Sequence, residues 1–320
     1  MQKRKYMKNS LIMNDLSFPS ILIMLFLCLA SCNNTGQRTD GTQDAGETSK
    51  QEMNTHRKQM GGLALYTLRD TLAINPKAVL KEVAETGYKY IEAAGYSEGK
   101  FYGMAPAEFK NYLNEIGLAP ISSHHGEVTL DNADEMIAAA KEAGFRYFVI
   151  PIPPMGHFKY DPQTNTLGMS EEVEEIMNII NTIAKKCTAA GLECLYHNHN
   201  MEFEENSKGI VPMDYFIENS DPAHLNFELD LYWAKKAGAD PVHYFNKAPG
   251  RFKAWHIKDM DEQGRFAPVG TGKIDFAEIL KHKDLAGMEY YFVEQDKAFD
   301  QTPMEAIKIS HDAIMALGFE

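Results

Sequence analysis

The stretch AAGLECLYHNHNMEF, residues 189–203, holds the pattern that decides the fold. A helical segment ends at Ala190, Gly191 follows, and the apolar run LECLY then leads into a cluster of polar residues. Glycine just past a helix end adopts the left-handed conformation that caps the helix. The same glycine junction recurs upstream before YKYIEA at 88–93, LAPISS at 118–123 and FRYFVI at 145–150. The chain is therefore expected to repeat a unit in which a helix is followed at once by a strand.

Eight strands are expected from this repeat and its continuation toward the C-terminus. They cover residues 62–68, 88–93, 118–123, 146–151, 192–198, 225–231, 252–258 and 289–294. Helical patterns lie between them, for example over residues 76–86, 107–116, 133–143 and 171–190. Strands that alternate with helices form parallel βαβ units, and eight units predict a single-domain (β/α)8 TIM barrel of the α/β class. An open doubly wound sheet is the alternative, but it usually carries a glycine-rich turn after its first strand, which YTLRDT at 66–71 lacks.

The first 60 residues are not expected to belong to the barrel. Residues 1–31 have a basic start and a short apolar run at 21–30, which is typical of a secretory signal peptide. Cys32 follows the small residues Ala30 and Ser31, and this arrangement resembles a bacterial lipobox, which implies cleavage before Cys32 and lipid attachment to its sulfur. A plain signal anchor is the alternative. Residues 32–60 are polar and predict a flexible tether, which leaves 61–320 for the barrel.

Composition narrows the classes of partner and of metal site. The net charge of −13 is spread along the chain, so the surface offers no electrostatic footprint for nucleic acid. Beyond the signal and Cys32, the cysteines are Cys187 and Cys194, which we expect to be two buried free thiols. No CxxC motif is present, which argues against a thiolate zinc site.

Four expected strands each carry an acidic or imidazole side chain near the C-terminal end. Alternate residues of a strand share a face, so in NFELDLYW at 226–233 the residue Asp230 faces the barrel interior when Leu229 faces the helices. The same alternation turns His197, His256 and Glu294 inward on the neighbouring strands. Active sites of TIM barrels lie at this end of the strands. The four side chains predict a site for one divalent metal, and their nitrogen and oxygen donors suit Mn²⁺, Zn²⁺, Co²⁺ or Fe²⁺ better than Mg²⁺.

Five motifs in this order resemble the xylose isomerase-like TIM-barrel superfamily. They are GLECLYHNHNMEF, FELDLYW, WHIKDMD, PVGTGKIDF and YYFVEQD, and the resemblance covers about residues 61–320. The superfamily contains sugar isomerases and epimerases, inosose dehydratase and endonuclease IV-type enzymes. The resemblance implies a metal at the ends of strands five to eight, which are the positions of His197, Asp230, His256 and Glu294.

One position departs from the ketose epimerases of that superfamily. These enzymes have a glutamate on strand five that works with the strand-eight glutamate as a pair of bases, whereas this chain has His197. The sequence His197-Asn198-His199 instead resembles the HxH pattern of the inosose dehydratase branch. Dehydration next to a ketone needs one base and one acid. We expect His199 or Glu294 to be the base and Lys258 to be the acid or to stabilise an oxyanion.

Other polar and aromatic residues near the barrel mouth are candidates for substrate contact, and each of them could equally serve structural hydrogen bonding or packing. The expected substrate-binding residues are Glu92, His124, His125, Glu202, Trp233 and Tyr66. Tyr66 and Arg69 are expected to end strand one, and Glu202 could instead support His199. The turn Gly270-Thr271-Gly272 does not follow the spacing of a P-loop, which argues against phosphate binding there.

The function expected from these features is enolising chemistry on an unphosphorylated keto-sugar or 3-keto-glycoside, with elimination or hydration as the outcome. A sugar isomerase or epimerase of the same superfamily is an alternative, and so is a sugar-binding lipoprotein without catalysis. An abasic-site nuclease is disfavoured by the acidic charge. The expected partner is a small carbohydrate. The protein is expected to be exported and lipid-anchored to a bacterial membrane, periplasmic or at the cell surface, and to meet the membrane only through the lipid. The sequence leaves the sugar, the metal and the oligomeric state open.

Overall fold

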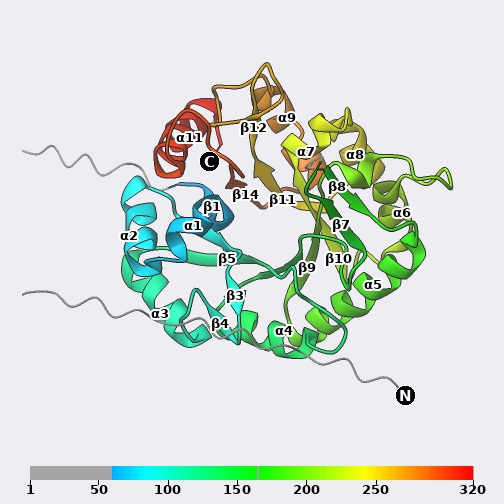
Figure 1. The fold of residues 1–320 in the computed structure, drawn as a ribbon, viewed down its shortest axis with the longest axis horizontal. Coiled ribbons are helices and arrows are strands. Elements are labelled where there is room, and N and C mark those ends of the chain that lie inside the picture. Colours follow the sequence, from blue (N-terminus) through cyan, green and yellow to red (C-terminus); the bar gives the residue numbers. More distant parts are fainter. Residues whose placement is uncertain (1–59, 164–165, 320) are drawn as a thin grey trace, which may run out of the picture. The chain divides into compact units, whose positions relative to one another are not determined.

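Eight parallel strands close into a barrel in this computed structural model, which describes residues 60–163 and 166–319 (Figure 1). The strands follow the order β1-β14-β11-β10-β9-β6-β5-β2 around the barrel. Their bounds are β1 Gly62–Ala64, β2 Tyr90–Ala93, β5 Ala119–His124, β6 Tyr147–Ile150, β9 Glu193–His197, β10 Leu225–Asp230, β11 Phe252–Ile257 and β14 Tyr290–Val293. The predicted (β/α)8 barrel is confirmed.

Helices surround the strands and cover their outer faces (Figure 1). Their bounds are α1 Arg69–Leu72, α2 Pro76–Thr86, α3 Pro106–Ile116, α4 Ala133–Glu142, α5 Val173–Ala190, α6 Pro212–Asn219, α7 Leu231–Lys236, α8 Pro241–Lys247, α9 Phe276–Leu280, α10 Lys283–Ala286 and α11 Pro303–Leu317. The 3-10 helices are η1 Leu65–Leu68 and η2 Met201–Phe203. The helix α5 ends where the sequence predicts, because Gly191 takes a left-handed backbone with φ 83°. Its long apolar stripe packs on the barrel and buries Ile176, Ile180 and Ile183.

The strand alternation builds two inward-facing layers of different chemistry. The apolar layer across the middle of the barrel contains Val149, Leu195, Ala254 and Phe292. The polar layer lies two residues further along the chain, on the same face: His197 follows Leu195, His256 follows Ala254, and Glu294 follows Phe292. The apolar layer therefore forms a dry floor beneath a polar layer at the C-terminal mouth.

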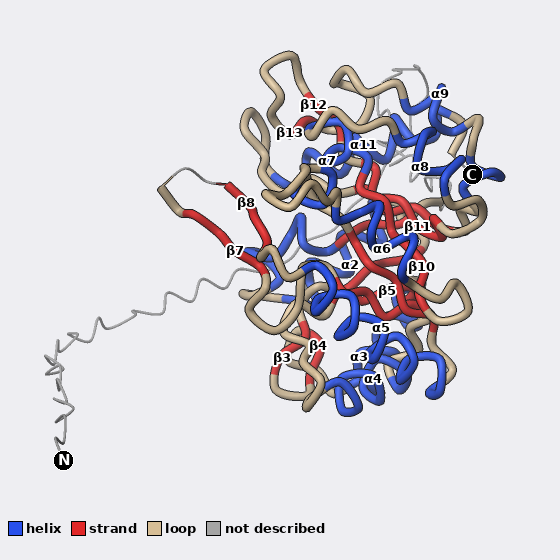
Figure 2. The backbone as a smooth tube through the Cα atoms, turned by 90° about the vertical axis from the view of Figure 1, so that its right-hand side faces the viewer, coloured by secondary structure: helices blue, strands red, loops and turns tan. Residues whose placement is uncertain are grey.

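Three two-stranded hairpins extend from loops on the mouth side of the barrel (Figure 2). They are β3 Tyr96–Ser97 with β4 Lys100–Phe101, β7 Phe158–Asp161 with β8 Thr166–Met169, and β12 Asp259–Met260 with β13 Phe266–Ala267. The sequence analysis did not predict them, because strands of two to four residues are too short to show a period.

The first predicted strand is wrong in length. The strand β1 ends at Ala64, and residues 65–72 form η1 and α1. The buried residues Leu65, Leu68 and Leu72 are spaced by three and four, which is the helical spacing rather than the strand spacing. Tyr66 and Arg69 therefore do not end strand one but lie on helical turns at the rim.

Several expectations fall on residues outside the described part of the chain. The signal peptide, Cys32 and the tether up to residue 59 lie there, so the structure does not test them. Within residues 60–163 and 166–319, none of the helices combines the length and the apolar run that a bilayer span requires. Cys187 and Cys194 are buried free thiols, as predicted.

Candidate metal centre

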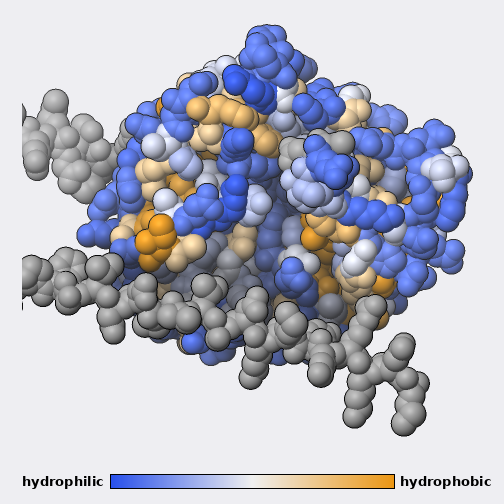
Figure 3. All heavy atoms as spheres, viewed as in Figure 1, coloured by the Kyte–Doolittle hydropathy of each residue, from blue (hydrophilic) through white to orange (hydrophobic). Residues whose placement is uncertain are grey.

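Seven ionisable side chains gather inside the mouth of the barrel. They are Glu92, His124, His197, Glu228, Asp230, His256 and Glu294, and all except the partly exposed His124 are buried. The space-filling view looks onto this mouth, which is hollowed near its centre and lined there by hydrophilic residues (Figure 3). Burying so much charge is costly unless the groups pair with one another or bind a metal.

His197, at the end of β9, is oriented by a carboxylate of the neighbouring strand. Its Nδ1 lies 3.0 Å from Oε2 of Glu228, and its Nε2 lies 3.8 Å from Oδ2 of Asp230. Because the carboxylate accepts a hydrogen bond, Nδ1 carries the proton and Nε2 presents a lone pair toward Asp230. Burial lowers the pKa of His197 well below its ordinary value, which keeps the ring in the neutral form that metals bind.

His256, on β11, repeats this arrangement with its nitrogens exchanged. Its Nε2 lies 2.6 Å from Oε1 of Glu92, whereas its Nδ1 lies 2.9 Å from Oε2 of Glu294 and 3.9 Å from Oδ2 of Asp230. Metal-binding histidines usually donate their second nitrogen to a carboxylate, which fixes the tautomer and the ring orientation. Both imidazoles thus have this support and direct their other nitrogen toward Asp230.

Asp230 ends β10 and also begins α7. Its Oδ1 accepts a hydrogen bond of 2.9 Å from the backbone N–H of Trp233, which caps the helix and fixes the carboxylate. Its Oδ2 is buried, pairs with Nζ of Lys258 at 2.9 Å, and lies 3.8 and 3.9 Å from nitrogens of His197 and His256. A buried carboxylate oxygen that two imidazole nitrogens approach in this way is suited to bind a metal.

Lys258 carries a positive charge into the same site. Its Nζ lies 2.7 Å from Oε2 of Glu294 and 2.8 Å from Oδ1 of Asp296, in addition to its contact with Asp230. Burial alone would lower the pKa of Lys258, but these three carboxylates outweigh it and raise the pKa well above its ordinary value. Lys258 is thus a fixed cation.

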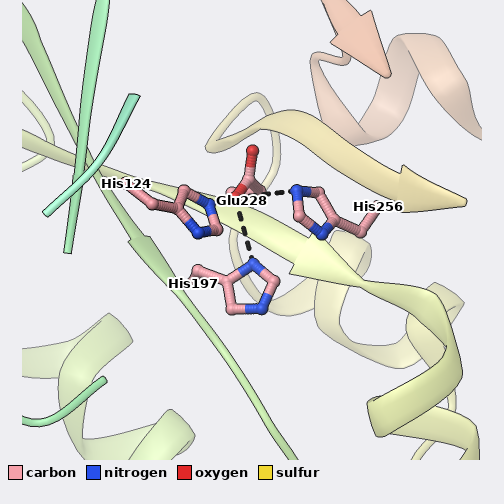
Figure 4. Close-up of side chains that lie close together, drawn as sticks. All are labelled: His124, His197, Glu228 and His256. Carbon is pink, nitrogen blue, oxygen red and sulfur yellow. Dashed lines mark hydrogen bonds and ion pairs between the residues drawn. The ribbon is translucent and has the colours of Figure 1, made fainter. Parts of the chain in front are cut away.

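Three of the four predicted ligands, Asp230, His256 and Glu294, form a group that could hold a divalent metal. Donor atoms of Asp230, His256 and Glu294 all lie within 4.8 Å of one another, and Nε2 of His197 faces Asp230 from the next strand. A second group, formed by His124, His197, Glu228 and His256, meets the same distance limit. In that group, however, the imidazoles surround the Glu228 carboxylate as hydrogen-bond partners (Figure 4). We take the group of Asp230, His256 and Glu294 as the candidate site, because all three of its members are predicted ligands.

His199 lies next to this site, in the loop after β9. Its ring centre lies 5.5 Å from that of Trp233, and its buried Nδ1 has no hydrogen-bond partner among the described residues. Burial and the charge of Lys258 lower its pKa to about 3, so the ring is neutral near pH 7. Glu202 holds the backbone here, because its Oε2 accepts a 2.7 Å hydrogen bond from the N–H of His199. Glu202 thus supports His199, one of the two roles expected for it.

The remaining predicted substrate residues divide between the interior and the rim. Glu92 and His124 belong to the hydrogen-bond network under the metal ligands. His125 stacks on Phe148 with its ring centre 4.0 Å away. Tyr66 is exposed at the rim, and Trp233 lies on α7 near the mouth. Direct substrate contact by these residues stays a prediction.

The glycine-rich turn at 270–272 has a structural role. Oδ2 of Asp259 accepts hydrogen bonds from the N–H groups of Gly270 and Gly272, at 3.0 and 2.9 Å, and Oδ1 accepts one from Ile274. A Cβ at Gly272 would lie 2.3 Å from the Asp259 carboxylate. The turn therefore wraps an internal carboxylate, which agrees with the expectation that it is not a phosphate cradle.

Glu228 and Asp296 are site residues beyond those predicted from the sequence. The alternation of side chains turns both inward together with the predicted ligand two positions away, which is Asp230 for Glu228 and Glu294 for Asp296. The register slips between Ile91 and Glu92 and again between Phe227 and Glu228. Glu92 pairs with Ser122 and Glu228 with Ala254 after these shifts, so the extra residue lies on β5 in one case and on β11 in the other.

Comparison with known proteins identifies relatives of this barrel. The model of the family described as xylose isomerase-like TIM barrel matches residues 80–297. The inosose dehydratase of Geobacillus thermodenitrificans (strain NG80-2) is 26% identical over 149 residues, which are 40% of this chain and 49% of that protein. The chain thus spans about half the length of the curated relatives it matches.

Solved structures extend the likeness over the whole barrel. A sugar phosphate isomerase/epimerase from Parabacteroides distasonis ATCC 8503 is 28% identical with a TM-score of 0.67, over 86% of this chain and 98% of that one. A structure of the protein IOLI with a bound zinc atom has a TM-score of 0.58 over 80% of this chain and 96% of that one. At 14% identity the second likeness shows the fold alone.

Proposed function

This chain belongs to the xylose isomerase-like TIM barrel family, and from that membership and the geometry of the mouth we propose a metal-dependent enolising enzyme. The proposed substrate is an unphosphorylated keto-sugar or 3-keto-glycoside. The proposed reaction removes the proton next to the carbonyl and ends in elimination or hydration. The proposal rests on one observation, namely that two carboxylate-supported imidazoles each direct their second nitrogen toward Oδ2 of Asp230, at 3.8 and 3.9 Å.

The metal would be held by His197, Asp230, His256 and Glu294. When bound, a divalent metal supplies a Lewis acid that polarises a carbonyl oxygen. Mn²⁺, Zn²⁺, Co²⁺ or Fe²⁺ suits two nitrogen and two oxygen donors. The relatives are sugar-modifying enzymes, which supports a catalytic role over sugar binding alone.

Two residues of the chain are suited to moving protons beside this site. His199 has a buried Nδ1 with no hydrogen-bond partner among the described residues, so by position it is the better candidate for the base that takes the α-proton. Glu294 is the poorer candidate by position, because its Oε2 is already paired with Nζ of Lys258 at 2.7 Å and with Nδ1 of His256 at 2.9 Å. Lys258 is positively charged and lies among carboxylates, so it can stabilise negative charge on oxygen or donate a proton.

The choice of elimination or hydration over epimerisation rests on His197. Epimerisation by two bases needs a carboxylate on each side of the reacting carbon, and the strand-five position here is an imidazole whose free nitrogen faces Asp230. The curated relatives that match this chain are inosose dehydratases, which supports elimination. An isomerase or epimerase is the second candidate, favoured by the 28% identical structure.

The state of the cations near the mouth supports an unphosphorylated substrate. Lys258 is surrounded by three carboxylates, and the guanidinium of Arg69 donates to the backbone carbonyls of Tyr66 and Asp296 at 2.9 Å each. Phosphate recognition in proteins generally uses cations with free donors. The proposed export signal and lipidated Cys32 agree with this, because glycosides reach a cell from outside.

The proposal is tested by incubating metal-loaded protein with 3-keto-glucosides and free ketoses in D₂O and following the products by NMR. Deuterium at the α-carbon together with loss or gain of water supports elimination or hydration, and an isomeric ketose or aldose supports the second candidate. Absence of exchange and of turnover on all substrates contradicts the enolising reading.

A pair of matched variants links that activity to the site. Asp230→Ala removes a predicted ligand and the cap of α7, whereas Asp275→Ala removes the equivalent cap of α9 away from the predicted ligands. The first variant should lose metal and turnover, and the second should keep both despite a cap loss of about 1 kcal/mol.

A further inference from the structure

His124 lies at the centre of the network beneath the proposed metal ligands. It ends β5, a strand that carries none of those ligands. Its Nε2 lies 3.0 Å from Oε1 of Glu92 and 2.8 Å from Oε2 of Glu228. One nitrogen thus contacts two buried carboxylates that come from two other strands, β2 and β10.

Each of those carboxylates orients one imidazole of the metal centre. Glu92 faces Nε2 of His256 at 2.6 Å, and Glu228 faces Nδ1 of His197 at 3.0 Å. The oxygens that contact His124 are the same oxygens that contact the ligand imidazoles, Oε1 of Glu92 and Oε2 of Glu228. Any displacement of these oxygens would therefore rotate the rings of His197 and His256.

The two carboxylates need a group between them. Both are buried, both also approach Nε2 of His256, and Oε1 of Glu228 has no hydrogen-bond partner among the described residues. Glu92 has one further partner, the hydroxyl of Ser122, which donates to Oε2 at 2.6 Å. Without the ring of His124, nothing would hold these two buried carboxyl groups in their present positions from the β5 side, and Glu228 would lose one of its few hydrogen-bond partners.

We propose that His124 is a positioning residue of the metal centre, which holds Glu92 and Glu228 where each orients one ligand imidazole. The inference rests on the proposed metal centre and adds to it a residue that is not one of the four proposed ligands. Outer-sphere partners of this kind typically contribute 10–100-fold to metal affinity. His124 acts one step further out, through two such partners at once.

A second metal ion in place of this network is the competing explanation. It would use His124, His197, Glu228 and His256, whose donor atoms lie within 4.8 Å of one another. The nitrogens of His124 and His197, however, point at one oxygen of Glu228 at hydrogen-bond distances of 2.8 and 3.0 Å (Figure 4). His197 and His256 would also have to bind two metals through their two nitrogens. The network of hydrogen bonds is the simpler account.

The substitutions at His124 follow from the nitrogen that it uses. His124→Leu removes the donor and keeps an apolar side chain of similar bulk. His124→Gln places its amide nitrogen near the position of Nε2, whereas His124→Asn places it near Nδ1, which is the nitrogen that the network does not use. His125→Leu is the matched control, because His125 is the adjacent buried histidine and bonds Ser123 rather than a carboxylate.

The measurements are the dissociation constant for Co²⁺ or Zn²⁺, the number of metals bound per chain, and the visible absorption spectrum of the Co²⁺-loaded protein. We expect one metal per chain in the wild type and 10–100-fold weaker binding in His124→Leu, with a shifted Co²⁺ spectrum. His124→Gln should recover most of the affinity and His124→Asn should not. His125→Leu should bind within about threefold of the wild type with an unchanged spectrum.

Several results would overturn the proposal. Unchanged affinity and spectrum in His124→Leu would do so, as would an equal loss in His125→Leu. Two metals in the wild type and one in His124→Leu would establish the second metal site instead. If His124→Leu does not fold, equal affinities of His124→Gln and His124→Asn contradict the proposal. A wild type that binds no metal refutes the metal centre itself, whereas a wild type that binds one metal regardless of residue 124 refutes only the role of His124.

Discussion

Replacing Lys258 with methionine is expected to destabilise the metal-free protein far more than the metal-loaded protein. The ammonium of Lys258 lies 2.7–2.9 Å from carboxylate oxygens of Asp230, Glu294 and Asp296. Asp230 and Glu294 are proposed metal ligands, and without a metal both of them contact the ammonium of Lys258, through Oδ2 and Oε2. The variant therefore leaves three carboxylates together in the interior of the metal-free protein.

In the metal-free protein, Lys258→Met should lower the free energy of unfolding by about 3–5 kcal/mol, which is the cost of removing one partner of a buried ion pair. In the metal-loaded protein, the metal neutralises Asp230 and Glu294, and Asp296 alone loses its partner. Burial raises the pKa of Asp296 to about 6, so this carboxyl takes up a proton at small cost, about 1 kcal/mol near neutral pH. The difference of about 3 kcal/mol corresponds to roughly 100-fold tighter metal binding by the variant.

Urea unfolding of chelator-treated and metal-loaded protein measures both free energies, and a metal competition assay measures the affinity. Lys253→Met is the control, because Lys253 pairs with Glu289, 3.1 Å away, near the start of β14 and away from the proposed ligands. In Lys253→Met, the free energy of unfolding should fall by the same small amount with and without metal. An equal loss by Lys258→Met in both states, or weaker metal binding, would refute the reasoning.

Three further predictions follow from the same geometry. Metal binding should release about one proton per chain at neutral pH. The reason is that three carboxylates outweigh burial and raise the pKa of His256, whose Nδ1 must lose its proton to bind a metal. Calorimetry in two buffers of different ionisation enthalpy measures the number of protons released, and a release of zero would contradict the prediction. Gly272→Ala should destabilise the fold by about 1–3 kcal/mol, because the new Cβ would lie 2.4 Å from the carbonyl oxygen of Met260. In the control Gly168→Ala the new Cβ would have no neighbour closer than 3.8 Å, so the midpoint of thermal unfolding should hardly change. Burial lowers the pKa of His125 to about 3, so as the pH drops the unfolded chain takes up the proton of this histidine before the folded chain does, and the free energy of unfolding falls below about pH 6.5. In His125→Gln the slope of the free energy of unfolding against pH, between pH 6 and 4, should be shallower by about 1.4 kcal/mol per pH unit. An unchanged slope would count against this assignment.

The barrel was predictable because its signals are local. The glycine at each helix end and the strand that follows lie within about ten residues of each other, as Gly191 and β9 show. The period of two along a strand then turned His197 and His256 inward without knowledge of their neighbours. Four ligand candidates on four consecutive strands could therefore be named from the sequence.

The network beneath those candidates was not predictable, because it depends on the register between strands. His124 contacts Glu228, 104 residues away in sequence, although β5 and β10 are not neighbours in the barrel. The period within one strand holds no information on which residues of distant strands meet inside the barrel. The error at Tyr66 has another cause, since the apolar run from Leu63 to Leu68 fits a short strand followed by a helical turn as well as it fits one strand.

The central claim is that one metal is held by His197, Asp230, His256 and Glu294. Anomalous diffraction from crystals grown with Mn²⁺ or Zn²⁺ tests it most directly. The account predicts a single peak per chain, about 2.0–2.2 Å from Nε2 of His197, Nδ1 of His256 and a carboxylate oxygen of each acidic ligand. A peak beside Nε2 of His124 and the Glu228 carboxylate, or no peak inside the barrel mouth, would contradict it.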